Sequence, residues 1–411
     1  MLNRSIIDTE DREKIHIGSY FIMLGTVLLF LGSGSALGIA DNYFFFMAAI
    51  VCNFIDFILH IRNYTKLKID YFFPFFALVI VFTILYLILG SYDRGTAFSM
   101  LMYAVLIISI SICEYSKSDA KNIINGVVIS SVIFSVLVVF FGKEYMYSGT
   151  NKYTFTQTFG SKITFEPNYL GSLLTLGFCL AVYMAIDELT DKKKKAVYIS
   201  SAIIVLVGLF LTGSRSALVS IFLFAAIVVI FMKPGKTKKA IIIFGIAIVI
   251  LVVILILTDV IPQSVYIRML KTSYNDRSNS KRVENWICGL KAMFDSPLIG
   301  NGPYLTIDIL RNKYGFVGDA HNTFITIGVM YGVPVLLLFI YAIIKLCYEL
   351  WRYCDRVLMA TFIAMIFEWN IIAAHFCIPT WLTIIILLVL AQNKKGQYDA
   401  LMLEDTQYVK M

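Results

Sequence analysis

Three residues of the chain combine a type and a setting suited to chemistry: Arg215, Arg282 and His321. Arg215 lies in "LFLTGSRSALVSIFLF" (209–224), between two apolar runs. A charge at a membrane boundary is costly and is by default a functional candidate, and a guanidinium binds phosphate oxygens through paired hydrogen bonds. The alternative is that Arg215 only reaches toward lipid headgroups, although Gly213 and the flanking serines leave room for a ligand.

A second candidate is the pair His321 and Asn322 in "FVGDAHNTFITIGVMYGVPVLLLF" (316–339), where a polar loop runs into an apolar segment. Free imidazole titrates near pH 6.5, so a histidine placed there can accept a proton from a substrate hydroxyl. Asparagine is also a favoured helix N-cap, so the pair is equally compatible with a structural role. Position in the sequence leaves both interpretations open.

The segment "KRVENWICGLKAMF" (281–294) predicts a short helix on which Arg282, Asn285, Trp286 and Gly289 share one face. The following "DSPLIGNGPY" contains the proline and glycine residues that end a helix and form a turn. Arg282 is therefore a second guanidinium available to a phosphate, with a solvated surface charge as its alternative.

The elements that must position these residues are membrane spans. Of the 411 residues, 59% are hydrophobic and 15% are charged, whereas soluble domains are about half apolar and about a quarter charged. We predict an all-α polytopic membrane protein, a single membrane domain over residues 1–411 with about 12 transmembrane helices of near-bilayer length. The predicted spans are 17–35, 42–60, 70–90, 97–113, 121–141, 168–187, 196–212, 215–232, 239–258, 321–344, 356–374 and 376–391.

The distribution of basic residues predicts the orientation, because lysine and arginine favour the cytoplasmic side. With the N-terminus inside, most of the 35 lysines and arginines fall in inner segments, including "DKKKKA" (191–196) and "KPGKTKK" (233–239). Both termini are then cytoplasmic, and two long loops, 142–167 and 259–320, lie outside. The second, between the ninth and tenth spans, is the helical extracytoplasmic loop. Lysines facing anionic lipid account for the net charge of +8, so no nucleic-acid partner is expected.

One acidic residue falls inside a predicted span. Glu368, in "MIFEWNIIAAH", is followed by Trp369 and Asn370. Carboxylates within a membrane are functional candidates, but an interhelical hydrogen bond is an equally good explanation.

The order of these motifs resembles the family of O-antigen ligases and Wzy-type polysaccharide polymerases. The elements that carry the resemblance are, in chain order, "FGSKITFEPNYLGSLL" (159–174), "TGSRSAL", the face with Arg282 and Trp286, "SPLIGNGP" and "AHNTFITIGVMYGVP". The resemblance is best over residues 160–345, whereas residues 1–140 match only as generic spans.

The resemblance implies an inverting, metal-independent glycosyltransferase of the bacterial cytoplasmic membrane, with no cofactor. Arg215 and Arg282 would bind the diphosphate of an undecaprenyl diphosphate-linked oligosaccharide, and His321 would act as the base. Membrane lipid, a flippase and a chain-length regulator of the same pathway are the expected partners. The expected substrate-binding residues are Asn322, Trp286, Lys281, Asn168 and Glu166. For Glu166, simple solvation in the loop is the alternative.

The family contains two reactions, and the abundance of basic residues in the outer loops favours one of them. A polymerase of O-antigen or capsule holds two lipid diphosphates, so extra outer cations suit it. These are Arg268, Lys271, Arg277, Lys281 and Lys291, with Lys143, Lys152 and Lys162. The alternatives are an O-antigen ligase that transfers glycan to a lipid-anchored core, and a polysaccharide or lipid transporter. A transporter predicts paired charges at the bilayer midplane instead.

Overall fold

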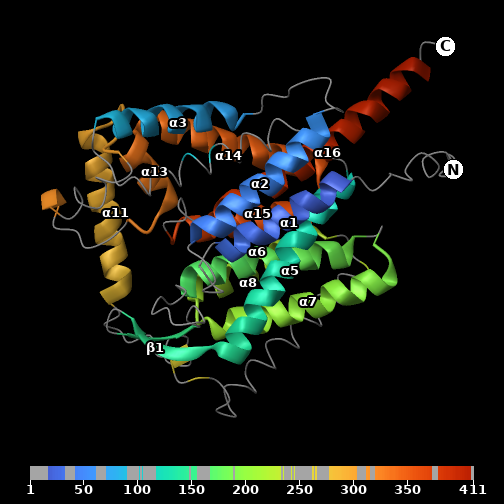
Figure 1. The fold of residues 1–411 in the computed structure, drawn as a ribbon, viewed down its shortest axis with the longest axis horizontal. Coiled ribbons are helices and arrows are strands. Elements are labelled where there is room, and N and C mark those ends of the chain that lie inside the picture. The colour runs from blue at the N-terminus through green and yellow to red at the C-terminus, as the bar shows by residue number, and fades with distance from the viewer. Residues whose placement is uncertain are drawn as a thin grey trace.

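The protein is built almost entirely of helices (Figure 1). The computed structural model describes residues 17–32, 42–61, 71–89, 117–147, 150–154, 167–187, 190–232, 277–302, 312–314, 320–372 and 378–408, with a few single positions between them. The helices are α1 Ile17–Gly32, α2 Asn42–Ile61, α3 Phe73–Ile88, α5 Lys117–Phe141, α6 Pro167–Ile186, α7 Lys192–Leu211, α8 Arg215–Phe231, α11 Arg277–Asp295, α13 Thr323–Tyr331, α14 Val333–Tyr353, α15 Arg356–Trp369 and α16 Ile378–Tyr408. The predicted spans 97–113 and 239–258 lie outside the described residues, apart from single positions.

Four of the described helices are long and apolar enough to cross a bilayer: 119–141, 167–186, 192–211 and 333–353. The apolar helices α3 and α8 are shorter. The helical membrane character is therefore confirmed, whereas the total of about twelve spans stays a prediction. Large apolar side chains such as Phe222 and Ile344 are exposed on the outer faces, as is typical of surfaces that lie against lipid rather than water.

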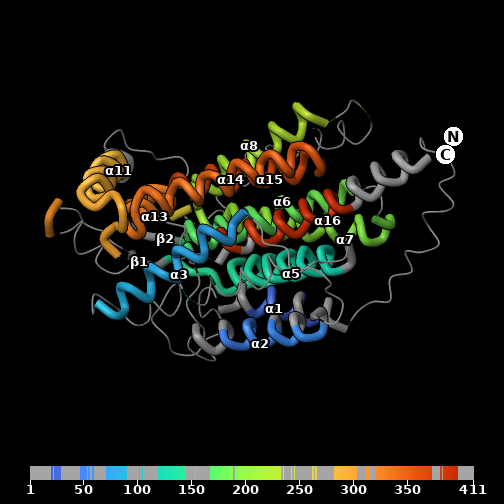
Figure 2. The backbone as a smooth tube through the Cα atoms, turned by 90° about the horizontal axis from the view of Figure 1, so that it is seen from above, coloured from blue at the N-terminus to red at the C-terminus, as the bar shows by residue number. Residues whose placement is uncertain are grey.

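Helix α6 forms the centre of the bundle. Viewed from above, α1 and α2 lie on one side of α5, and the layer with α14, α15 and α8 lies on the far side of α6 and α16 (Figure 2). Most residues of α6 are buried on all sides, as expected for a helix surrounded by others. Small residues allow close approach, since a Cβ on Gly177 would lie 2.0 Å from Ser131 Oγ of α5.

The structure adds one feature to the sequence-based prediction and corrects another. In the first long loop, for which no secondary structure was predicted, β1 (Lys143–Tyr147) and β2 (Thr150–Thr154) form an antiparallel hairpin in which Lys143 pairs with Thr154. The predicted span 321–344 is not one helix, because Gly332 adopts φ 86° between α13 and α14. A left-handed residue followed by Pro334 cannot continue a helix.

The hairpin contacts the second long loop. The backbone N–H of Ser264 donates to Glu144 Oε1 at 2.8 Å. Residues 144 and 264 belong to the two long loops of the sequence-based prediction, so these loops meet in the structure; the side of the membrane on which they lie stays a prediction.

The connections define two ends of the bundle. We call one the site end; it contains Asn168, Ser214, His321 and Asn370. We call the other the basic end; it contains Lys121, Lys194, Glu349 and Lys395. At the basic end, Tyr71 donates to Glu349 at 3.1 Å, and the Lys395 ammonium lies 3.6 Å from the same carboxylate.

Candidate functional site

Arg215 is the first residue of α8, and a tight turn presents it. Gly213 has φ 63°, and the Ser214 N–H donates to Thr212 Oγ1 at 3.2 Å. The Thr212 hydroxyl in turn donates to the Leu209 carbonyl at 2.7 Å. The turn itself is buried while Arg215 is exposed, so a guanidinium projects from a fixed backbone at the positive end of a helix dipole, which favours an anion.

The turn before Arg215 packs on the start of α6. Ser214 Oγ donates to Asn168 Oδ1 at 3.4 Å and lies 3.2 Å from Ser216 Oγ. A Cβ on Gly171 would be only 2.7 Å from Ser214 Cβ, so a glycine is needed for this close approach. The structure therefore brings together the two sequence elements "EPNYLG" and "TGSRSAL", which lie far apart in the chain.

His321 lies directly before α13 in an uncommon backbone conformation. Its φ is 47°, the one positive value among the described non-glycine residues, in the left-handed region where histidine and asparagine are more frequent than most residues. The residue is exposed. Asn322 follows as the N-cap, with Oδ1 accepting from the N–H groups of Phe324 and Ile325 at 3.0 and 3.1 Å. The structural role of Asn322 is thus real, and it fixes the backbone that carries His321.

Asn322 also joins α13 to the end of α15. Its amide nitrogen lies 3.3 Å from the Asn370 carbonyl and 3.4 Å from Asn370 Oδ1. The Thr323 hydroxyl donates to the Ile372 carbonyl at 3.1 Å. The end of α15 therefore fixes the position of His321.

The same end of α15 contacts the start of α8 through Glu368. This side chain is fully buried and faces the hydroxyl groups of Ser220, Ser216 and Thr175. Neither carboxylate oxygen makes a hydrogen bond of ordinary geometry with the described residues. The interhelical hydrogen bond considered from the sequence is thus not formed as a regular one. Glu368 links the packing of α15 with that of α8 beside Arg215.

Arg215 and His321 accordingly flank one structural element, the end of α15. Arg215 is next to Ser216, which faces Glu368, and His321 is next to Asn322, which contacts Asn370. Glu368 and Asn370 are two residues apart in the chain. The sequence singled out this segment as polar residues in a span but gave no indication that it connects the two candidate groups.

Helix α11 presents the predicted face to α13. Asn285 and Gly289 are buried, Arg282 and Trp286 are partly buried, and the residues between them are mainly exposed. A Cβ on Gly289 would lie 2.5 Å from Ile325 Cγ2 and 3.5 Å from Ala320 Cβ. These two residues bracket His321, so α11 packs against the segment that carries it. The indole N–H of Trp286 has no hydrogen-bond partner among the described residues.

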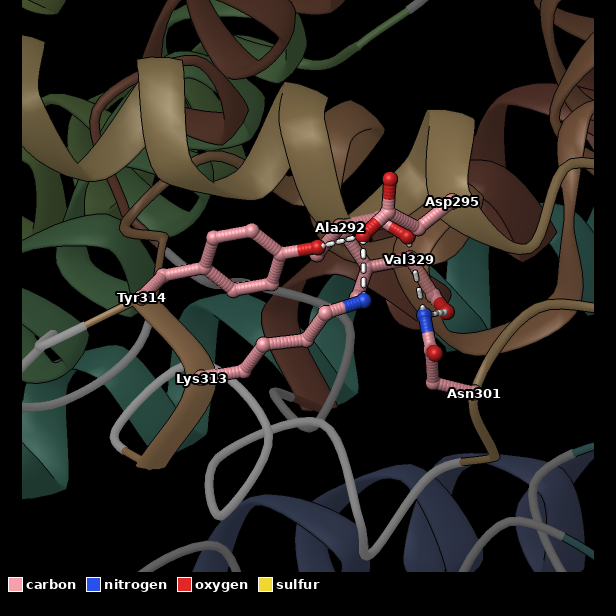
Figure 3. A network of polar contacts seen from close by, with 6 residues as sticks. All are labelled: Ala292, Asp295, Asn301, Lys313, Tyr314 and Val329. Atoms are coloured by element: carbon pink, nitrogen blue, oxygen red, sulfur yellow. Dashed lines mark hydrogen bonds and ion pairs between the residues drawn. The ribbon is translucent and has the colours of Figure 1, made fainter.

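The "SPLIGNGP" turn is joined to the break between α13 and α14. Asn301 donates through Nδ2 to the carbonyls of Ala292 and Val329 at 3.1 and 3.2 Å (Figure 3). The Val333 N–H donates to the Pro297 carbonyl at 2.7 Å. Two of the short sequence motifs therefore meet in one contact, which fixes the angle between α11 and α13.

A polar cluster stabilises the end of α11. Asp295 accepts hydrogen bonds from Lys313 and Tyr314 (Figure 3). The hydrogen bond from Lys313, followed by that from Tyr314, lowers the pKa of the Asp295 carboxyl below its usual value. These residues secure the segment 312–314 to α11 and are separate from the candidate reacting groups.

Of the other predicted site residues, three lie among the residues that the structure describes and one does not. Lys281 lies in α11, one residue before Arg282. Glu166 lies outside the described residues. Asn168 and Asn322 are at the site end, where both make structural hydrogen bonds, and their contact with substrate stays a prediction.

The fold and the site define a helical membrane protein whose candidate groups follow the chain order arginine, arginine, histidine. Residues 200–340 match the family model described as O-antigen ligase. The matched segment begins in α7, ends in α14 and contains Arg215, Arg282 and His321. No curated protein matches the chain.

The family match confirms the resemblance inferred from the motifs. It covers roughly a third of the 411 residues, and over that segment the chain is similar to the O-antigen ligase family. Asn168, Glu368 and Asn370 fall outside the match and are connected to it only through the fold.

Proposed function

We propose that the protein is a glycosyltransferase that polymerises undecaprenyl diphosphate-linked repeat units of O-antigen or capsule at the outer face of the bacterial cytoplasmic membrane. The observation that carries the proposal is the arrangement of Arg215 and His321 on either side of the end of α15, with α11 and its Arg282 packed on the His321 segment. The match to the O-antigen ligase family supports a transferase acting on lipid-linked oligosaccharide.

The proposed reaction assigns one role to each charged group. The guanidiniums of Arg215 and Arg282 bind the donor diphosphate and stabilise the charge that grows on it as it leaves. The acceptor sugar hydroxyl attacks the anomeric carbon while His321 removes its proton. The new C–O bond forms as the bond to the diphosphate breaks, which inverts the configuration and releases undecaprenyl diphosphate. Trp286, Lys281, Asn168, Glu166 and Asn322 would contact or orient the sugars.

The exposed position of His321 suits this reaction. A residue at the surface end of a bundle can meet a sugar in water while the prenyl tail of its substrate remains in lipid. The asparagine cap that follows fixes the backbone, which places the imidazole without burying it.

The test of the polymerase assignment uses purified full-length enzyme. With the undecaprenyl diphosphate-linked repeat unit alone, we expect a ladder of longer products. A deletion strain is expected to carry surface glycan truncated to one repeat unit. A ladder that also forms with His321→Ala enzyme would contradict the assigned site.

An O-antigen ligase is the second candidate, because the matching family model carries that description. A ligase uses the same donor and transfers glycan to a lipid-anchored core oligosaccharide. Product that appears only when this core is added would favour the ligase and exclude the polymerase.

The proposed orientation places the site end outside, with both termini in the cytoplasm. Single cysteines at Lys193 and Glu284, both exposed, test it in a background without native cysteines. An impermeant maleimide is expected to label position 284 in intact cells and position 193 only after permeabilisation. The reverse pattern would invert the topology and remove the outer-face reaction. A flippase and a chain-length regulator are the proposed functional partners.

A further inference from the structure

A cavity of about 670 Å³ lies between α1, α5 and α7. The proposed transferase reaction does not use it. Its walls come from one face of α5, the start of α7 and the side chains of Tyr20 and Met23 of α1.

The polar end of the cavity carries two cations. Lys121 lies near the start of α5 and Lys194 near the start of α7, together with Asn122 and Asn125. The starts of two helices direct positive dipole ends to the same place, which favours an anion. Lys121 forms no ion pair with another residue in the described part of the chain.

One acidic group also faces this end. Asp191 caps α7 by accepting from the Lys194 N–H at 2.8 Å, and its carboxylate lies 3.7 Å from the Lys194 ammonium. This N–H bond holds the pKa of Asp191 below its usual value. Lys192, Lys193 and Lys195 are exposed on the same turn, so the local charge remains positive.

The rest of the cavity is apolar and follows one face of α5. Val128, Ile129, Val132 and Ile133 succeed the polar residues at helical spacing, and Val197 faces them from α7. From Lys121 to Ile133 the helix rises about 18 Å, close to half of the roughly 30 Å hydrocarbon core of a bilayer. Tyr198 donates to Asn125 Oδ1 at 2.6 Å and marks the boundary between the two parts.

The cavity lies at the opposite end of α5 and α7 from the candidate active site. Lys121 is separated from Phe141, at the other end of α5, by about 30 Å of helix. Likewise α7 begins beside the cavity and ends at the turn that carries Arg215. Whatever fills the cavity therefore does not share the site that would hold the donor diphosphate.

We propose that this cavity binds an anionic phospholipid of the leaflet at the basic end. The phosphate lies between Lys121 and Lys194, and the hydrocarbon chains pack along Val128, Ile129 and Ile133. Charge complementarity selects the headgroup, and the length of the apolar face matches one leaflet. The inference does not depend on the proposed transferase reaction, because bound lipid can be measured directly.

The test uses delipidated full-length protein offered phosphatidylglycerol and phosphatidylcholine, with bound lipid counted by native mass spectrometry. Wild-type protein is expected to retain phosphatidylglycerol in preference. The double variant Lys121→Gln, Lys194→Gln should bind phosphatidylglycerol about 25-fold more weakly, since each basic residue contributes a factor of about five. The control, Lys192→Gln with Lys193→Gln, removes the same charge from exposed residues that do not line the cavity and should bind as wild type.

A second variant tests the apolar part. Ile133→Trp fills the apolar part of the cavity without changing the charge and should reduce the retention of both lipids. Equal weakening in the two double lysine variants, or no preference for phosphatidylglycerol, would overturn the proposal. Displacement of the lipid by millimolar inorganic phosphate, with binding unaffected by Ile133→Trp, would instead identify a phosphate site that needs no lipid tail.

Discussion

Ser214 Oγ lies 3.4 Å from Asn168 Oδ1, so the residue before Arg215 is hydrogen-bonded to the second residue of α6. This contact spans 46 residues of sequence and fixes the start of α8 against the central helix of the bundle. Gly171, one turn further along α6, makes the approach possible because any side chain there would meet Ser214. The orientation of Arg215 is therefore a property of α6 as much as of its own helix.

Gly171→Ala is predicted to impair transfer beyond its effect on stability. The added methyl would lie 2.7 Å from Ser214 Cβ, and such overpacking costs about 1–3 kcal/mol. The matched control is Gly177→Ala in the same helix, whose Cβ would lie 2.3 Å from Ser131 Cβ in the α5–α6 contact, away from the turn. Melting temperature and transfer rate are measured for both. We expect similar destabilisation in Gly171→Ala and Gly177→Ala but a larger loss of rate for Gly171→Ala; equal losses of rate would mean that the turn has no special role.

Arg215→Lys is predicted to restore little of the activity lost in Arg215→Ala. Lysine keeps the charge but cannot make the paired hydrogen bonds of a guanidinium to a diphosphate. Because Arg215 is exposed, neither variant should lower the melting temperature markedly. Transfer rates at saturating donor provide the measurement. Full activity of the lysine variant would indicate a point charge that only faces lipid headgroups.

His321→Asn separates the chemistry of His321 from its backbone conformation. Asparagine tolerates the positive φ of 47° but cannot act as a base near neutral pH. We expect normal expression and insertion with transfer reduced by about 10²-fold or more, the usual contribution of a general base. Activity in His321→Asn together with loss in His321→Ala would point to a positioning role, with no proton transfer.

Glu368→Gln is predicted to keep most of the transfer activity, whereas Glu368→Leu loses it. The amide preserves the shape and hydrogen-bonding capacity beside Ser216 and Ser220, and a buried charge without a cation partner is costly. Glutamine should therefore leave the melting temperature unchanged or raised. If Glu368→Gln is inactive while Glu368→Asp is active, an ionisable group is needed there and the packing explanation is wrong.

Below about pH 4, near the ordinary aspartate pKa, the segment 312–314 is predicted to detach from α11. Hydrogen bonds from Lys313 and Tyr314 lower the pKa of Asp295 in the folded protein. A group with a lowered pKa stabilises the fold above its unfolded pKa, and this contribution disappears as the pH falls through the folded pKa. Amide hydrogen exchange of residues 312–314 measures this detachment. Asp295→Asn should exchange faster at neutral pH and show no further change on acidification; an unchanged acid response in that variant would assign it to another group.

The sequence was most informative where helices are long and apolar. The alternation of apolar runs with charged breaks located α5, α6, α7 and α8 to within a few residues, because span length is set by the bilayer. The face of α11 followed from helical spacing alone. Two local features were missed although their signals were present: the turn residues between β1 and β2 favour a hairpin, and Gly332 followed by Pro334 favours a helix break.

The pairing of distant groups needed the tertiary structure. Nothing in the local sequence indicates that Asn322 contacts Asn370, or that Glu368 faces Ser216, because these contacts depend on which helices are neighbours. The cavity at Lys121 and Lys194 likewise requires two helix starts to meet.

The sequence by itself indicated the membrane environment, the helices and the chain order of the residues that could do chemistry, because composition and periodicity are properties of short segments. Only the tertiary structure decided that the end of α15 connects Arg215 with His321, and that a lysine-lined cavity lies at the other end of the bundle. The physical reason is that apolar helices can pack in many alternative arrangements that bury similar areas. The choice among these arrangements is made by contacts between segments remote in sequence, such as the glycine contact of Gly171 with Ser214 and the polar contact of Asn322 with Asn370.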